Sequence, residues 1–150
     1  MSSSSIPRAI DGLISILHAD KTMSAVAIID GQPTTDLPGD YIAIGYADDS
    51  STSITGTQDP IALGNLRREE KYTISCEVSS WVGTTVMKTA RDRAFAILAN
   101  VERIVRADGT LNGSVIFADF GSALNVTQIQ TQQGAVVTIT FDIAIKINRI

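Results

Sequence analysis

Cysteine, histidine, aromatic residues and charge are all scarce in this chain of 150 residues. It has one cysteine and one histidine, 5% aromatic residues and 19% charged residues, where an ordinary soluble domain has roughly 25% charged residues. A lone cysteine, Cys76, excludes an internal disulfide and a cysteine-rich zinc site. The longest apolar run, residues 94–99, is much shorter than the ~20 residues that cross a bilayer, so we expect no membrane partner.

Basic residues are outnumbered by acidic ones. The chain has 12 Lys and Arg against 16 Asp and Glu, which gives a formal net charge of −4. Tight binding to nucleic acid draws its energy from cations placed on phosphates, so we do not expect it here. Hydroxyl side chains replace the missing charges, with 29 Ser and Thr. Such a surface loses water more cheaply than a charged one, which favours a protein that is largely covered by other protein.

The residues of common catalytic sites are absent or isolated. His18 is the only histidine, and we interpret it as a structural residue in the last turn of a helix, where the helix dipole favours a partly charged imidazole. The sequence has no phosphate-binding glycine loop, no paired-histidine zinc motif and no nucleophile elbow. No basic segment followed by an apolar one opens the chain, so we do not expect export by that route. We expect no enzyme activity, no metal and no cofactor.

Length and patterning predict a single domain over residues 6–150, preceded by a flexible polar tail over residues 1–5. The predicted fold class is α+β. It consists of a mixed, mostly antiparallel sheet with two helices packed on one face and a long C-terminal β-hairpin.

Two segments have the apolar spacing of helices. The first runs from Ile6 to Leu17, with Ser5 placed to cap it. The second runs over residues 85–107, where Thr84 or Thr85 can serve as the cap. Each has one apolar side, so we expect both helices to pack on a sheet.

Three segments in the first half of the chain predict strands. Two are short β-branched runs at residues 25–29 and 41–46. The third, residues 72–78, alternates between apolar and polar positions. Cys76 falls on the apolar side, where we interpret it as a small buried hydrophobe rather than a nucleophile. Trp81 falls on the polar side, so either a bulge turns it inward or it is exposed, as interface anchors often are.

Residues 48–66 predict a long surface loop, in which a short strand around Ile54 is the one sign of order. Asp48 and Asp49 have two interpretations, a solvated loop or a contact with a hard cation, but the spacing of a calcium loop is absent. Residues 67–70, with the sequence RREE, predict a neutral charge cluster at the entrance of the next strand.

Residues 114–131 and 137–147 predict the two arms of a long hairpin with its turn at residues 132–134. The second arm alternates throughout, whereas the first loses its alternation after Gly121. About 16 residues at ~3.3 Å each reach ~50 Å, more than the ~40 Å diameter of a compact domain of this length. We therefore expect the hairpin to overhang its domain and to be completed by a neighbouring copy of the chain. A coiled hairpin that stays within one monomer is the alternative.

Amide side chains gather near the tip of this hairpin, next to Gly134. They are Gln128, Gln130, Gln132 and Gln133. Two interpretations stay open: a soluble hairpin tip, or an uncharged contact surface that faces a neighbouring copy or a channel.

Four stretches carry a likeness to a known family: DLPGDY at residues 36–41, EEKYTISC at 69–76, ARDRAF at 90–95 and QQGAVV at 132–137. They resemble the tail terminator proteins of long-tailed, non-contractile bacteriophages, above all those of phages of actinobacteria. The resemblance extends from the first predicted helix to the last predicted strand, and no single stretch is a signature of the family.

The resemblance implies a virion protein, assembled in the host cytoplasm, that forms a ring on the head-proximal end of the tail tube. Family members are hexamers that stop tube polymerisation and then meet the head. The implied partners are copies of the chain itself, the tail tube protein, the head-tail connector protein and the tape-measure protein. The implied contact regions are the loop over residues 48–59 and the hairpin around residues 132–134. Six copies at −4 each would carry −24, so DNA would pass through without specific binding.

Two other interpretations remain open. The chain could be another virion ring protein, either a head-side connector or a tail tube subunit. A small enzyme or ligand-binding domain would instead need a concave pocket with convergent polar groups, around His18 or Cys76.

Overall fold

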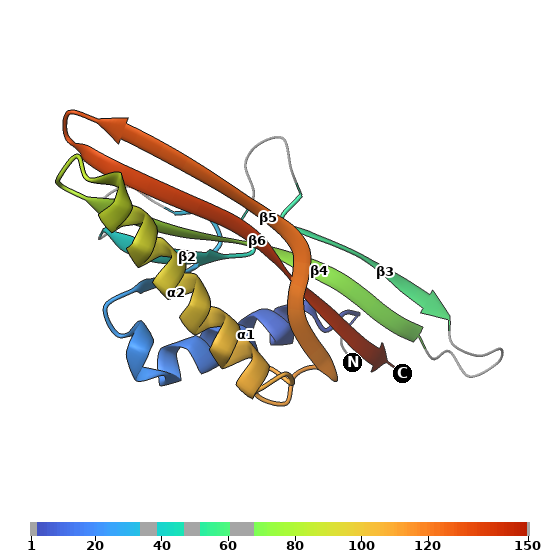
Figure 1. The fold of residues 1–150 in the computed structure, drawn as a ribbon. Coiled ribbons are helices and arrows are strands. Elements are labelled where there is room, and N and C mark those ends of the chain that lie inside the picture. The colour runs from blue at the N-terminus through green and yellow to red at the C-terminus, as the bar shows by residue number, and fades with distance from the viewer. Residues whose placement is uncertain (1–2, 34–38, 47–51, 61–67, 150) are drawn as a thin grey trace.

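The computed structural model describes residues 3–33, 39–46, 52–60 and 68–149. Within these ranges the helices are α1 (Ile6–Ala19), the short 3-10 helix η1 (Lys21–Met23) and α2 (Met87–Ala107). The strands are β1 (Ala27–Asp30), β2 (Asp40–Ile44), β3 (Ile54–Pro60), β4 (Arg68–Val82), β5 (Phe117–Thr131) and β6 (Gly134–Arg149). The predicted α+β class is confirmed (Figure 1).

The strands form one sheet in the order β1-β2-β4-β6-β5, and β3 pairs with β4 beyond the end of β2. β1 and β2 are parallel, and the other neighbours are antiparallel. Both α-helices lie on one face of the sheet, which leaves the other face open (Figure 1). The start of α1 and the end of β6 lie at one end of the sheet, and the β5–β6 turn lies at the opposite end (Figure 1).

The core lies between the helices and the sheet. β4 and β6 contribute every second residue to it, because successive side chains of a strand point to opposite faces. Fully buried positions include Leu13, Leu17, Ile74, Cys76, Val78, Val101, Val105, Val137, Ile139 and Ile143. Phe120 stacks on Phe141 with ring centroids 5.1 Å apart. The predicted alternation of β4 and β6 and the burial of Cys76 are confirmed.

The predicted helices are present and Ser5 occupies the N-cap position of α1, but the side-chain caps expected for both helices are absent. Ser5 makes no side-chain cap hydrogen bond at the start of α1, because its hydroxyl is bonded to Glu70 on β4. α2 begins directly after Val86, again without a side-chain cap, so neither Thr84 nor Thr85 has the expected role. Most of the stability of such helices comes from the packing of their apolar side, and side-chain caps are not needed.

The structure corrects the expected loop over residues 48–66. Part of it, β3, is a strand of 7 residues rather than a short strand around Ile54. Its threonines favour a strand, but its glycine, aspartate and proline do not, so its own strand propensity is mixed. It is a strand because it pairs with β4 along its whole length, from Ile54 opposite Ile74 to Pro60 opposite Arg68.

The hairpin is present, but the expected overhang is wrong. Every residue of β6 from Ala135 to Arg149 pairs with β4, which extends as far as the hairpin does. The loss of alternation after Gly121 marks a real irregularity, because the register between β5 and β6 shifts between Phe120 and Leu124. The hairpin therefore belongs to the sheet of its own chain, and only its outer side lacks a neighbour in the described residues.

Candidate interaction surface

The open face of the sheet carries an apolar row next to the hairpin turn. Trp81 on β4 pairs with Val136 on β6, and Val136 pairs with Ile129 on β5. Residues paired in this way have their side chains on the same face. Trp81 is 46% exposed and Ile129 is 54% exposed. Of the two alternatives for Trp81, the exposed one is therefore correct.

Glycines surround the indole of Trp81. A Cβ at Gly134 would lie 2.9 Å from the indole Nε1, one at Gly83 would lie 3.5 Å from Cη2, and one at Gly39 would lie 3.9 Å from Cε3. Only the Cβ at Gly134 would be too close to the ring, so the absence of a side chain there leaves room for the indole, whereas Cβ atoms at Gly83 and Gly39 would make ordinary van der Waals contact with it. The outer part of the ring stays open, as in an aromatic interface anchor.

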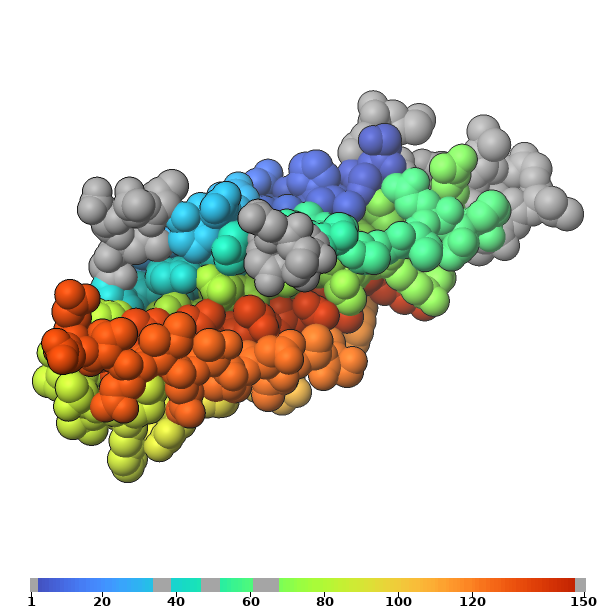
Figure 2. All heavy atoms as spheres, turned by 90° about the horizontal axis from the view of Figure 1, so that it is seen from above, coloured from blue at the N-terminus to red at the C-terminus, as the bar shows by residue number. Residues whose placement is uncertain are grey.

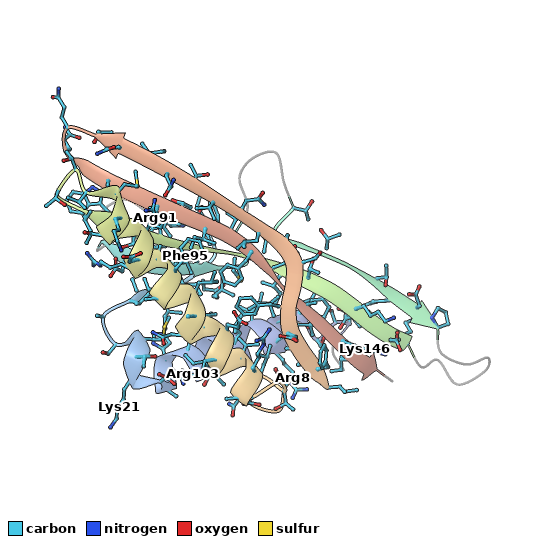
Figure 3. The ribbon with its side chains drawn as sticks, viewed as in Figure 1. Arg8, Lys21, Arg91, Phe95, Arg103 and Lys146 are labelled. Atoms are coloured by element: carbon cyan, nitrogen blue, oxygen red, sulfur yellow. The ribbon has the colours of Figure 1, made fainter. Side chains whose placement is uncertain are left out.

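Apolar side chains also flank β5 on the helix side. Leu124 is 56% exposed and Val126 is 43% exposed, and both pair with buried residues of β6. Phe95 on α2 is 37% exposed and lies one turn from Arg91 (Figure 3). Arg91 Nη1 donates a hydrogen bond to Gln128 Oε1 on β5, at 2.9 Å. The strand is therefore held against the helix while its apolar side chains stay exposed.

We call β5 residues 124–131, together with Trp81, Val136 and Phe95, the hairpin-edge surface. No charged residue occurs from Phe120 to Phe141. In the described part of the chain β5 pairs only with β6, and it runs along one side of the open face (orange, Figure 2). An uncharged, apolar surface with an unpaired strand edge is typical of a protein interface.

At the end of the sheet opposite the hairpin turn, a buried carboxylate on β4 binds the residues that precede α1. Glu70 is 2% exposed and accepts hydrogen bonds from Ser5 N at 2.8 Å and from Ser5 Oγ, Ser4 Oγ and Gln58 Nε2 at 2.6 Å each. Burial alone would raise the pKa of Glu70, but these hydrogen bonds outweigh it and lower the pKa from 4.5 to about 2. Ser5 Oγ also lies 2.8 Å from Tyr72 Oη. Ser4 and Ser5, which the sequence assigned to a flexible tail, are therefore bound to the sheet.

Between the two ends, the open face is lined by hydroxyl groups. They border a hollow of about 560 Å³ whose lining includes Thr55, Thr73, Ser75, Thr138, Thr140 and the carboxylates Glu77 and Asp142. Tyr41 Oη donates to Glu77 Oε2 at 2.8 Å, and burial together with this bond raises the pKa of Tyr41. Among the residues that the structure describes, no group of three His, Cys, Asp or Glu could hold a metal ion.

The glutamines that the sequence singled out divide into two groups. Gln128 and Gln130 lie on the helix side of β5, where Gln128 accepts from Arg91 and the amide of Gln130 donates to the carbonyl oxygen of Thr85. Gln132 and Gln133 are exposed in the hairpin turn. The first group links the hairpin to α2 and the start of that helix, and only the second is at the tip.

Gly134 is buried rather than presented for contact. A Cβ there would lie 2.2 Å from the carbonyl oxygen of Val82, so glycine lets β6 begin close against β4. Asp48 and Asp49 lie outside the described residues. The exposed apolar residues of β5 were missed from sequence, although Leu124 and Val126 are apolar positions in an otherwise polar arm.

The two residues proposed for a ligand pocket do not come together. His18 is exposed at the end of α1, whereas Cys76 is fully buried in the core, where burial raises the pKa of its thiol to about 12. Neither lines the hydroxyl-bordered hollow. In the described ranges, no helix has the length and apolar character needed to span a membrane.

Comparisons with known proteins identify a shared fold. No family model matches the chain, and no curated protein matches its sequence. Among solved structures, the chain is similar to a chain in the virion of a native gene transfer agent particle, with a TM-score of 0.58 and 15% sequence identity. The similarity covers 97% of this chain and 99% of that chain.

Proposed function

We propose that this chain is a structural protein of a phage-like virion. It forms a ring on the head-proximal end of the tail tube, ends tube polymerisation there and joins the tail to the head connector. The observation that carries the proposal is the fold similarity to a chain of a gene transfer agent virion, because it extends over nearly the whole of both chains. The four stretches that resemble tail terminator proteins support the specific role at the end of the tube.

The proposed role requires surfaces rather than catalysis. A ring that binds the last tube ring covers the surface on which the next one would assemble, so growth stops without a chemical step. The hairpin-edge surface supplies an uncharged, apolar region for contact between copies. The net charge of −4 per copy makes a ring that repels DNA phosphates, as a passage for DNA should.

The test is a tube-capping experiment with the tail tube protein of the same particle. The tube protein is polymerised with and without this chain, and tube lengths are measured by electron microscopy. We expect growth to stop at one end, with a single extra ring there, and the chain alone to form rings that do not stack. Tubes of unchanged length contradict the proposal. Incorporation along the whole tube would identify a tube subunit, and binding to the head connector alone would identify a head-side ring.

A further inference from the structure

We propose that copies of the chain join edge to edge, with β5 of one copy paired antiparallel to β1 of the next, so that the sheet continues from copy to copy. This inference rests on the proposed ring and names the contact that builds it. The contact uses the hairpin-edge surface on one side of the sheet and the β1 edge on the other.

Only two of the unpaired strand edges lack protection. In the described residues β1, β3 and β5 each have a neighbour on one side only. β3 has a glycine at residue 56 and ends with Asp59 and Pro60, residues that discourage pairing at an edge. The 124–131 arm of β5 has no charge and no proline, and β1 has a single charge, Asp30, at its last position. These two unprotected edges lie at opposite sides of the sheet.

The strand directions make the pairing antiparallel. β1 is parallel to β2, and each step from β2 through β4 and β6 to β5 reverses direction. β1 and β5 therefore run in opposite directions. A second copy placed beside the first in the same orientation brings its β1 antiparallel to β5, which is the commoner kind of pairing.

The two edges also lie at the same level of the sheet. Ile29 on β1 pairs with Ala43, Ala43 with Glu77, Glu77 with Thr140, and Thr140 with Asn125 on β5. One row of paired residues thus joins the middle of β1 to the exposed arm of β5. The next copy needs no large stagger along the strands to bring the edges together.

The side chains that the two edges bring together are mostly uncharged. At this level of the sheet, Ile28 meets the apolar Val126 on the helix side, and Ile29 meets the polar but uncharged Asn125 on the open face. Ile28 and Ile29 point to opposite faces, and both are partly exposed. Ile129 adds exposed apolar area on the open face further along β5.

Pairing of β5 with β5 of a second copy is the competing arrangement. It would join two copies around a two-fold axis and leave both β1 edges unpaired. Pairing of β5 with β1 covers both unprotected edges with one kind of contact. It also gives each copy two different contact surfaces, which a closed ring of more than two copies requires.

Opposite charges placed on the two edges test the contact. We expect Asn125→Lys alone or Ile29→Glu alone to raise the concentration needed for assembly at least about tenfold, because each buries an unpaired charge at the contact. We expect the double variant to assemble again, because residues 125 and 29 lie in the same row, so the lysine and the glutamate face each other on the same side of the sheet. The full chain is measured by analytical ultracentrifugation, with circular dichroism to confirm folding. Thr57→Lys on the edge of β3 is the matched control and should assemble like the wild type.

Disulfide formation gives a second measurement that leaves the edges uncharged. Asn125→Cys and Ile29→Cys in one chain should form disulfides between copies on oxidation and give a ladder of linked species in a denaturing gel. Asn125→Cys with Thr57→Cys is the control and should give none. Cys76 does not interfere, because it is fully buried and its pKa is raised to about 12.

The outcomes separate this inference from the proposed function. Rings that persist in both single variants, without linked species from the first cysteine pair, overturn the edge contact and leave the capping role standing. Loss of assembly with Asn125→Lys but not with Ile29→Glu indicates β5–β5 pairing and also overturns it. A wild-type chain that stays single at high concentration overturns both. Rings that respond as expected but do not stop tube growth support the edge contact and overturn the capping role.

Discussion

The side chains at the two ends of the sheet differ in their contacts, which are made within the chain at one end and left open at the other. At the end where α1 begins, the buried Glu70 accepts four hydrogen bonds from its own chain. At the hairpin end, Trp81 and Ile129 are about half exposed, and the edge of β5 has no described neighbour. The difference indicates a division of roles. Substitutions at the first end should change the free energy of unfolding, and substitutions at the second should change association between copies.

The largest effect on folding is expected from Glu70→Ala. It removes the acceptor of four hydrogen bonds and leaves buried donors from Ser5 unpaired, so we expect the free energy of unfolding to fall by about 2–4 kcal/mol. Urea denaturation of the full chain measures this loss. Glu70→Gln keeps the shape and part of the bonding and should lie between the alanine variant and the wild type. A loss below about 1 kcal/mol for alanine would show that the network does not hold this end together.

A smaller effect, on association only, is expected from Trp81→Ala. Removal of an aromatic anchor from an interface commonly weakens it by about 2 kcal/mol, or roughly 30-fold. Because the side chain is 46% exposed, the free energy of unfolding should change by less than about 1 kcal/mol. Sedimentation and denaturation of the same sample measure both quantities, and Trp81→Phe should keep part of the association. A variant that unfolds easily but assembles normally would reverse the division between the two ends.

Helices and strands that bury one side could be predicted from the sequence, whereas β3 could not. α2 and β6 were predicted because their buried residues repeat with the period of the element, as Ala94, Val101 and Val105 do on the helix. β3 was expected to be mostly loop, because its strand-favouring threonines alternate with a glycine and an amide and are followed by Asp-Pro, and because its hydrogen bonds come from β4. Local pattern predicts elements that bury one side, but not a polar strand that depends on its neighbour.

The residues at the two ends of the sheet were also predictable only in part. The position of Trp81 on the polar side of β4 left two alternatives, exposure or a bulge, and the sequence did not decide between them. Glu70 shares its side of β4 with Tyr72 and Cys76, which point toward the core. The charges at residues 67–70 were instead interpreted together, as a neutral cluster at the entrance of the strand. The decisive partners, Ser4 and Ser5, are 65 or more positions away in the chain, and sequence pattern does not show such contacts.

Low pH should selectively destabilise the end of the sheet at which α1 begins. The hydrogen bonds around Glu70 lower its pKa from 4.5 to about 2 in the folded chain, so its carboxylate stabilises the fold above about pH 4.5. This contribution is lost as the pH falls from about 4.5 towards 2, because the unfolded chain takes up the proton first. Denaturation midpoints measured between these values should fall less steeply for Glu70→Gln than for the wild type. Equal slopes would mean that other carboxylates cause the acid loss.

The smallest effect on the denaturation midpoint is expected from Glu69→Gln, one residue away from Glu70. Glu69 also lies between charged partners, with Lys71 Nζ at 2.9 Å and Lys146 Nζ at 3.6 Å (Lys146 is labelled in Figure 3). Its side chain points to the open face, where water already solvates all three charges, so loss of these ion pairs should leave the denaturation midpoint unchanged. Glu70 differs because its carboxylate is buried and so are the two donors of Ser5 that it binds. If Glu69→Gln shifted the midpoint as far as Glu70→Gln, surface charge rather than the buried network would hold this end of the sheet.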